Sequence, residues 1–233
     1  CLSRGLGDVY KRQLRMDGNM LRLIVVNGIP AGIQNSIIAV ANVFVQSNIN
    51  QFGALAMAGC GSYSKIEGFG FIPVTCFSQA LTTFIGQNLG AKEYDRTKKG
   101  ALFGTICGIG IAEVIGIAVF FFSPYLIAAF GGDQKAIEYG IAEAHTIAFF
   151  YCLLAFSHCM AAIQRGAGRS IVPMFVMMIV WCGVRVTYIS IVIRIIPVIN
   201  VIYWAYPLTW FISSVIFLIL FLKTDWIHGL EKQ

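Results

Sequence analysis

Two acids, Glu67 and Glu143, are the residues of this chain best placed to do chemistry, because each lies in a stretch that is otherwise mostly apolar. At 1.5 Å per helical residue, Glu67 lies roughly 13–15 Å, and Glu143 about 12 Å, from the same end of its expected helix. A carboxylate at that depth in a bilayer is costly, and a bound cation, a proton or a basic partner makes it tolerable. We therefore consider both acids candidates for cation or proton coupling, with an ion pair to Lys65 or to another helix as the alternative for Glu67.

Amides and aromatic residues could line a cavity beside these acids. Gln34, Asn35 and Asn42 fall on one broad face of an expected helix. Such amides either hydrogen-bond between helices or line a wet cavity, and their number favours the cavity. Tyr63 and Phe71 are candidates for an aromatic wall that attracts organic cations, although packing is the alternative for most aromatic residues here.

Other ionisable residues are more ambiguous. Glu113 has either a structural partner, such as Arg185, or a function. His145 and His158 are expected to be hydrogen-bonded packing residues. Arg185 itself is expected to approach the outer face of the membrane and extend its charge toward water.

No sequence pattern supports hydrolytic or nucleotide chemistry. The sequence has no GxSxG, HExxH or Walker A pattern, so we expect no enzyme activity. Its seven cysteines are scattered and show no CxxC or Cys/His spacing, so we expect no disulfide and no metal site. The net charge of +6 comes from short basic groups between apolar stretches, which orients a membrane protein and does not indicate nucleic-acid binding.

The elements that must position these residues are long apolar stretches. The chain is 58% hydrophobic and 12% charged, and no charged residue lies between Arg22 and Lys65. A bilayer core of about 30 Å needs about 20 apolar residues per helix. The pattern predicts an all-α membrane protein with a six-helix transmembrane bundle. The expected helices cover about 20–47, 57–89, 98–122, 135–164, 170–194 and 200–222.

Basic residues are distributed unevenly between the two sides of this bundle. The loops at 90–100 and 165–170 and both ends of the chain are basic, whereas the other side receives Lys135 and Arg194. The positive-inside rule then makes both termini and those two loops cytoplasmic. Residues 1–13 have no Met start and end in DVYKRQ, which resembles a translated sequencing adapter. We expect 1–13 to be a non-native leader, 14–223 the transmembrane region and 224–233 a cytoplasmic tail.

Three segments resemble the multidrug and toxic compound extrusion (MATE) family. They are LRLIVVNGIPAGIQNS in the first expected helix, IGQNLGAKEYDRTKKG after the second, and QRGAGRSIVP between the fourth and fifth. The second segment is the most specific, because it combines a GQ pair with a basic loop. The matching positions are Gly86, Gln87, Gly90, Arg165, Gly166, Gly168 and Pro173.

The resemblance implies the C-terminal lobe of a twelve-helix, two-lobe transporter that works with an N-terminal six-helix lobe in a bacterial plasma membrane. It implies an antiporter that exports small amphipathic or cationic compounds by alternating access, coupled to Na⁺ or H⁺ and without another cofactor. One branch of the family uses an acid in the second helix of this lobe, here Glu67, and one in the fourth, where Glu143 is a loose match. Other branches place these acids in the other lobe. Alternatives are a lipid-linked oligosaccharide flippase, hinted at by Lys65 and Arg185, and a non-transporting membrane scaffold.

Overall fold

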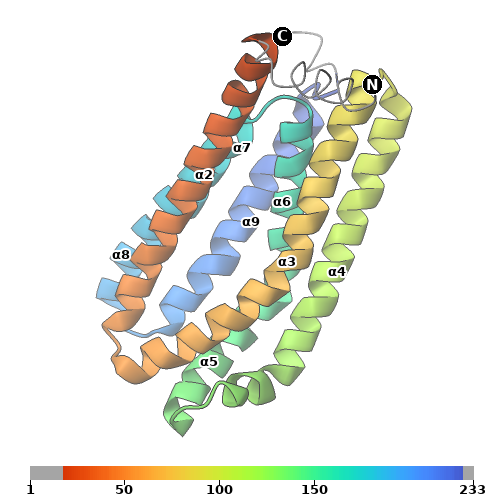
Figure 1. The fold of residues 1–233 in the computed structure, drawn as a ribbon. Helices are drawn as coiled ribbons and strands as arrows, with labels where there is room; N and C mark the ends of the chain where they lie inside the picture. The colour runs from red at the N-terminus through yellow and green to blue at the C-terminus, as the bar shows by residue number, and fades with distance from the viewer. Residues whose placement is uncertain (1–17, 228–233) are drawn as a thin grey trace, which may run out of the picture.

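The computed structural model describes residues 18–227, and every regular element in that range is helical (Figure 1). Six helical segments within it are long and apolar enough to cross a membrane, which confirms the predicted six-helix bundle. The expected leader 1–13 and the last residues of the expected tail lie outside the described range. The elements are α2 (Gly18–Asn50), α3 (Ala54–Gly90), α4 (Tyr94–Ala129), α5 (Gln134–Ile147), η1 (Ala148–Phe150), α6 (Tyr151–Gly166), α7 (Ile171–Met177), η2 (Met178–Val184), α8 (Arg185–Ile195) and α9 (Asn200–Lys223).

The spans run alternately up and down, so the basic segments gather at one end of the bundle. The start of α2, the α3–α4 turn, the α6–α7 turn and the end of α9 all lie at the top of Figure 1. We call this the basic end. The opposite end carries the α2–α3, α4–α5 and α8–α9 connections. The basic end holds Arg22, Lys92, Arg96, Lys98, Lys99, Arg165, Arg169 and Lys223.

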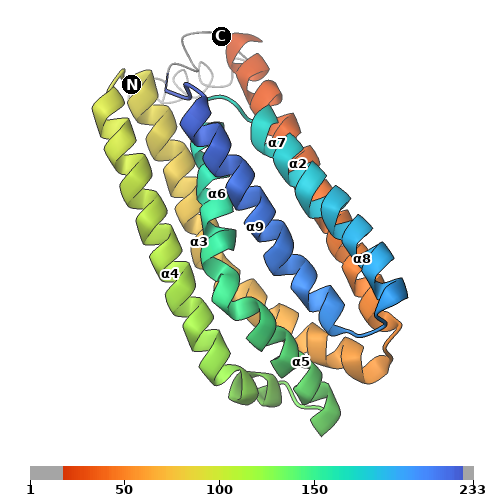
Figure 2. The same cartoon turned by 180° about the vertical axis from the view of Figure 1, so that it is seen from behind.

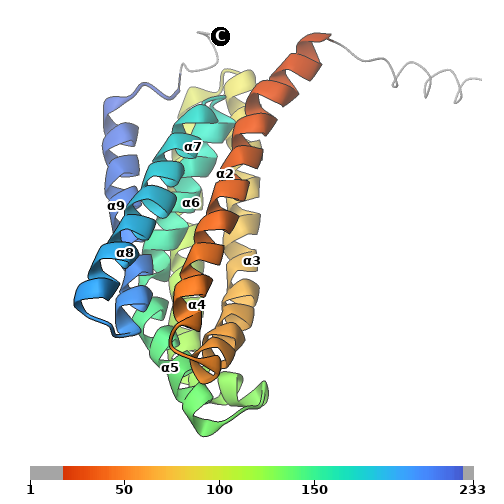
Figure 3. The ribbon, with the colours of Figure 1, turned by 90° about the vertical axis from the view of Figure 1, so that its left-hand side faces the viewer.

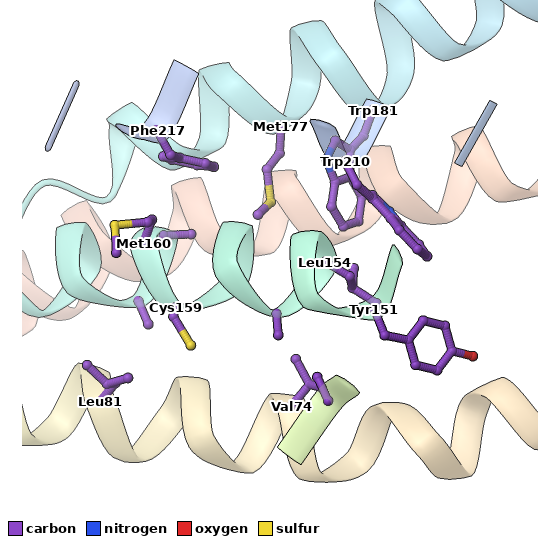
Figure 4. Packing of buried hydrophobic residues seen from close by; sticks show 14 of the residues in the cluster. Val74, Leu81, Tyr151, Leu154, Cys159, Met160, Met177, Trp181, Trp210 and Phe217 are labelled. Carbon is purple, nitrogen blue, oxygen red and sulfur yellow. The ribbon is translucent and has the colours of Figure 1, made fainter. Parts of the chain in front are cut away.

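Helices α3, α4, α5 and α6 (residues 54–166) form a tightly packed unit, which we call the four-helix block. Glycines let these helices approach closely. A Cβ atom added at Gly59 would overlap the backbone carbonyl of Ala136, and one added at Gly116 would overlap that of Ala148. Helix α6, which carries Leu154 and Cys159, lies between α3 with Val74 and Leu81 and the segment that carries Met177 and Trp181 (Figure 4).

The fourth span differs from its expected form, because the predicted continuous helix is interrupted. A short 3₁₀ turn, η1, separates α5 from α6, and Gly116 of α4 packs against Ala148 in that turn. The backbone N–H of Cys152 at the start of α6 donates to Oε2 of Glu113 at 3.2 Å. Glu113 therefore accepts a hydrogen bond from a backbone N–H in the first turn of α6, where N–H groups lack a partner within their own helix. This contact replaces the expected ion pair of Glu113 with Arg185.

Helix α2 runs beside α7 and α8 in the same direction (Figures 2 and 3). We call α2 together with residues 171–195 the α2–α8 arm. Three polar contacts join its two sides, and in each contact the two residues are 143 positions apart in the sequence. Because this separation is constant, the helices run parallel and in register. Their spacing of seven to eight residues is two helical turns, as in a parallel coiled coil. The contacts are Ser170 Oγ to Asn27 Oδ1 (2.8 Å), Gln34 Nε2 to Met177 Sδ (2.8 Å) and Arg185 Nη1 to Asn42 Oδ1 (3.5 Å).

Two irregular segments lie where the block and the arm face each other. Helix α3 changes direction about halfway along its length (Figure 1), in the region that contains Gly68, Gly70 and Pro73. Proline has no N–H to donate, so a bend at this place is physically expected. In the arm, α7 and α8 are joined by a π-helical segment, η2, whose wider turn shifts the direction of the side chains in α8.

Candidate functional site

A cavity of about 390 Å³ lies between the α2–α8 arm, the bent part of α3, α6 and α9. We call it the central cavity. Its wall combines polar and aromatic residues, which is typical of a site for an amphipathic molecule. The polar lining residues are Asn42, Gln46, Ser64, Glu67 and Arg185, and the aromatic ones are Phe71, Trp181, Tyr206 and Trp210.

Glu67 is the acid of the central cavity. It lies on α3 next to Gly68, which also lines the cavity, and its side chain is half-buried. Lys65, two residues away, points elsewhere and places its ammonium 5.3 Å from the ring centroid of Phe130. Lys65 is exposed and does not line the cavity, so the local pairing considered for Glu67 is not what the structure shows.

Arg185 is the base of the central cavity, and the expectation that it extends toward water at the membrane surface is wrong. Its side chain is only 2% exposed. One terminal nitrogen, Nη2, donates to Thr209 Oγ1 at 2.8 Å, and the guanidinium lies 4.4 Å from the ring centroid of Tyr206. Because α8 begins directly after the π-helical segment, Arg185 follows Trp181 by one turn and both face the cavity. Arg194, farther along α8, is exposed as expected.

Glu143 lies in a different place from Glu67. It is buried at 3% exposure in α5 and is not among the residues that line the central cavity. Its surroundings are polar, because it interacts with the side chain of Cys60, whose Sγ also lies 3.4 Å from the hydroxyl of Tyr203. Among the described residues, Oε2 of Glu143 has no hydrogen-bond partner. Glu67 therefore lines the central cavity and Glu143 does not, although the two carboxylates are close enough to interact electrostatically.

Amide residues of α2 take both roles that the sequence allowed, which are contact between helices and lining of the cavity. Gln34 is buried and donates to Met177, so it joins the two sides of the arm. Asn42 and Gln46 line the central cavity. Asn35 is exposed and is not part of the cavity lining.

The two aromatic candidates also lie in different places. Phe71 lines the central cavity, and its ring meets that of His158 edge to face at 5.0 Å. Tyr63 is buried in the block, where its hydroxyl lies 3.1 Å from that of Tyr151. His145 stacks on Phe120, with Nε2 3.1 Å from the carbonyl of that residue, so it has both contacts that a packing histidine would have.

The sequence interpretation missed three aromatic residues of the cavity, Trp181, Tyr206 and Trp210. A signal for two of them was present. Tyr206 and Trp210 are four residues apart in the segment WAYPLTW, so they share one face of a helix. Trp181 lies four residues before Arg185 in the fifth expected helix and shares a face with it, but Arg185 was expected at the membrane surface.

The residues that carry the family motifs lie toward the basic end and not in the central cavity. Gly166 packs against α3 so closely that an added Cβ would lie 2.7 Å from the carbonyl of Thr82. Arg165 donates through Nη2 to Ser78 Oγ at 3.1 Å, and Gly168 adopts a left-handed backbone with φ +76° in the α6–α7 turn. These motif positions hold the turn and the α3–α6 crossing together. Of the other motif positions, Gly86 packs near Gly166, Pro173 is buried in α7, and Gln87 and Gly90 are exposed.

Comparison with known proteins gives a consistent result. Residues 30–191 match the model of the MatE family. The chain is 25% identical over 176 residues to the probable multidrug resistance protein YoeA of Bacillus subtilis (strain 168), which covers 76% of this chain and 38% of that protein. It is 28% identical over 110 residues to the FAD transporter of Shewanella oneidensis, covering 47% of this chain and 24% of that protein.

The fold also matches solved transporters. The crystal structure of MATE in complex with MaL6 superposes with a TM-score of 0.84 at 17% sequence identity. That match covers 95% of this chain and 50% of the other. The chain therefore spans about half the length of that transporter, and the match to YoeA covers an even smaller share of its relative.

Proposed function

The chain belongs to the MatE family, and from that premise we propose that its six helices form one lobe of an ion-coupled exporter of small amphipathic molecules. The observation that carries the proposal is the central cavity, which places an acid, a base and aromatic rings in the middle of a membrane bundle. The second, N-terminal lobe would supply the other wall, because related transporters are about twice as long. Export by alternating access would then come from the movement of one lobe against the other.

Glu67 is the residue that we propose for ion coupling in this lobe. Ionisable groups within membrane spans are expensive and mark ion and proton pathways by default. Glu67 meets this description and also lines the cavity, so uptake of Na⁺ or H⁺ at its carboxylate would change the charge that a bound substrate meets. Glu143 is buried outside the cavity, so we assign it no direct contact with the substrate.

The distribution of basic residues supports an orientation in a bacterial plasma membrane. The basic end would face the cytoplasm, together with the chain termini, in agreement with the positive-inside rule. The end with Lys135 and Arg194 would face outward.

Two alternative functions can be weighed against the cavity. A flippase for a large anionic lipid needs several bases along its path, and of Lys65 and Arg185 only Arg185 lines the cavity. A scaffold would have no use for a cavity that contains both charges. The relatives differ in their named function, because one is a probable multidrug resistance protein and another is an FAD transporter.

The test is Glu67→Gln in the full-length transporter, assayed as dye export from membrane vesicles under an imposed Na⁺ or H⁺ gradient. We expect coupled export to fall by roughly tenfold or more, because an interaction with a charged group contributes about 1.5–3 kcal/mol. The amount of protein in the membrane should stay near normal. Glu138→Gln on the exposed side of α5 is the matched control and should export normally. Unchanged export with unchanged ion dependence would move the coupling site to the other lobe, whereas loss of the protein itself would show a structural role.

A further inference from the structure

We infer that Arg185 forms an oxyanion site in the central cavity, so the transported molecule carries a carboxylate or phosphate group as well as an apolar body. This inference rests on the proposed function, because it names the substrate class of the same cavity. A transporter for simple organic cations has no need of a buried guanidinium in its binding cavity. The inference therefore predicts zwitterionic or anionic amphiphiles as ligands.

The guanidinium is incompletely paired in the described structure. Both of its hydrogen-bond acceptors are neutral: Thr209 Oγ1 lies 2.8 Å from Nη2, and Asn42 Oδ1 lies 3.5 Å from Nη1, a long contact. Among the described residues, the buried Nε has no acceptor at all. A guanidinium carries five N–H donors, and leaving donors buried without an acceptor is unfavourable. Glu67, the acid of the same cavity, attracts the guanidinium electrostatically, and an oxyanion in the cavity would supply the acceptors that its N–H groups lack.

The same guanidinium is restrained by Tyr206, Trp181 and Thr209. Its carbon lies 4.4 Å from the ring centroid of Tyr206 and 5.4 Å from that of Trp181, so two aromatic residues of the cavity wall lie against the guanidinium. Thr209 is itself fixed, because its hydroxyl lies 2.9 Å from the carbonyl of Ala205. A fixed planar fork matches the two oxygens of a carboxylate or phosphate, which a flexible point charge does not do.

The charge balance of the cavity also favours a ligand with both signs. Of its lining residues, Glu67 on α3 is the acid and Arg185 on α8 is the base. A ligand with only a positive charge would be attracted by one and repelled by the other. A zwitterion satisfies both, with its cationic part toward α3 and its anionic part toward α8. The aromatic lining residues would contact the apolar body between them.

Matched ligand pairs test this directly on the purified full-length transporter. Rhodamine 19 carries a free carboxylate, and rhodamine 6G is its ethyl ester, so the two dyes differ in that group. Flavin mononucleotide and riboflavin form the corresponding pair for phosphate. We expect the wild-type protein to bind the acidic member of at least one pair roughly tenfold or more tightly, as one charge-assisted hydrogen-bond pair predicts. The pair that shows the preference identifies the oxyanion.

Arg185→Gln should remove that preference, so that the acidic and the non-acidic member of the pair bind with about equal affinity. Arg194→Gln, an exposed arginine on the same helix, is the control and should keep the preference. If Arg185→Gln does not fold, Arg185→Lys keeps the charge but loses the fork, and it should reduce the preference about threefold or more. Wild-type protein that binds both members of each pair equally well would overturn the inference and leave the proposed export function intact. Failure to bind or export any of the four compounds would overturn the proposed function as well.

Discussion

The four-helix block and the α2–α8 arm are built by different means. In the apolar parts of the spans, the share of residues buried inside the protein is 22%, 28% and 61% for α3, α4 and α5–α6 of the block, and 12% and 33% for α2 and residues 171–195 of the arm. The block is joined through backbone contacts at glycines in addition to side-chain hydrogen bonds, and the arm through polar side-chain contacts two turns apart. Backbone contacts leave no freedom to adjust, whereas side-chain contacts can be exchanged. The comparison indicates that the block is the rigid wall of the central cavity and the arm its adaptable wall.

The division matters for function because the two cavity charges lie on different units. Glu67 belongs to the block, and Arg185 belongs to the arm. A ligand or ion that contacts one of them can therefore stabilise one arrangement of the two units over another. A conformational switch requires such a difference in binding between two arrangements. The π-helical segment directly before Arg185 lies in the arm, in keeping with the frequent occurrence of such segments at functional sites.

The largest effect is expected from Gly59→Ala in the block. The added Cβ would overlap the carbonyl of Ala136, a backbone atom that cannot rotate away, so α3 and α5 must separate. We expect a loss of about 1–3 kcal/mol or more, measured as a lower midpoint of thermal unfolding of the purified protein. Gly61→Ala is the matched control on the same helix, because a Cβ there meets no atom within 4 Å. Gly61→Ala should be neutral or stabilise by up to about 1 kcal/mol, and equal effects of the two changes would show that the crossing is not rigid.

A smaller effect is expected from Glu113→Ala, which removes the acceptor of the Cys152 N–H at the start of α6. The loss should be about 0.5–2 kcal/mol, as for other helix caps. Glu113→Gln keeps an oxygen acceptor and should lose less than half as much. The measurement is again the unfolding midpoint, with exposed Glu138→Ala as the control. If the Gln and Ala variants lose the same stability, the charge of Glu113 matters and its role is not only that of a cap.

Predictable and unpredictable features occur in both units of this structure. Span number and approximate limits could be predicted because a bilayer sets the length of an apolar helix, and long uncharged stretches are visible in the sequence. Glu67 could be singled out because an acid in such a stretch is rare. The inward direction of Arg185 could not, because it depends on the π-helical segment before it, and the interruption at η1 depends on the contact between Gly116 and Ala148. Both are tertiary features that no periodicity records.

The smallest effect is expected from Gln34→Leu in the arm. Gln34 is buried and donates to the sulfur of Met177 at 2.8 Å, and a thioether is a weak acceptor. Within the described range its carbonyl oxygen, Oε1, is buried without a partner. Leucine is similar in size and removes both the weak hydrogen bond and the unpaired carbonyl. The first loss lowers the free energy of unfolding and the second raises it. Hydrogen bonds between membrane helices contribute about 0.6 kcal/mol on average, so we expect the unfolding midpoint to change very little.

Gln34→Ala sharpens this prediction, because it removes the same polar contacts and leaves a void. It should destabilise the protein clearly more than Gln34→Leu does, by about 1 kcal/mol or more, since unfilled volume in a packed helix pair is costly. That order would show that packing holds the arm together and that its polar contacts mainly set the register between α2 and α8. If Gln34→Leu instead lowers stability as much as Gly59→Ala, the polar contacts hold the arm as firmly as glycine contacts hold the block. The arm would then be a second rigid wall, and movement for transport would have to come from the lobe as a whole.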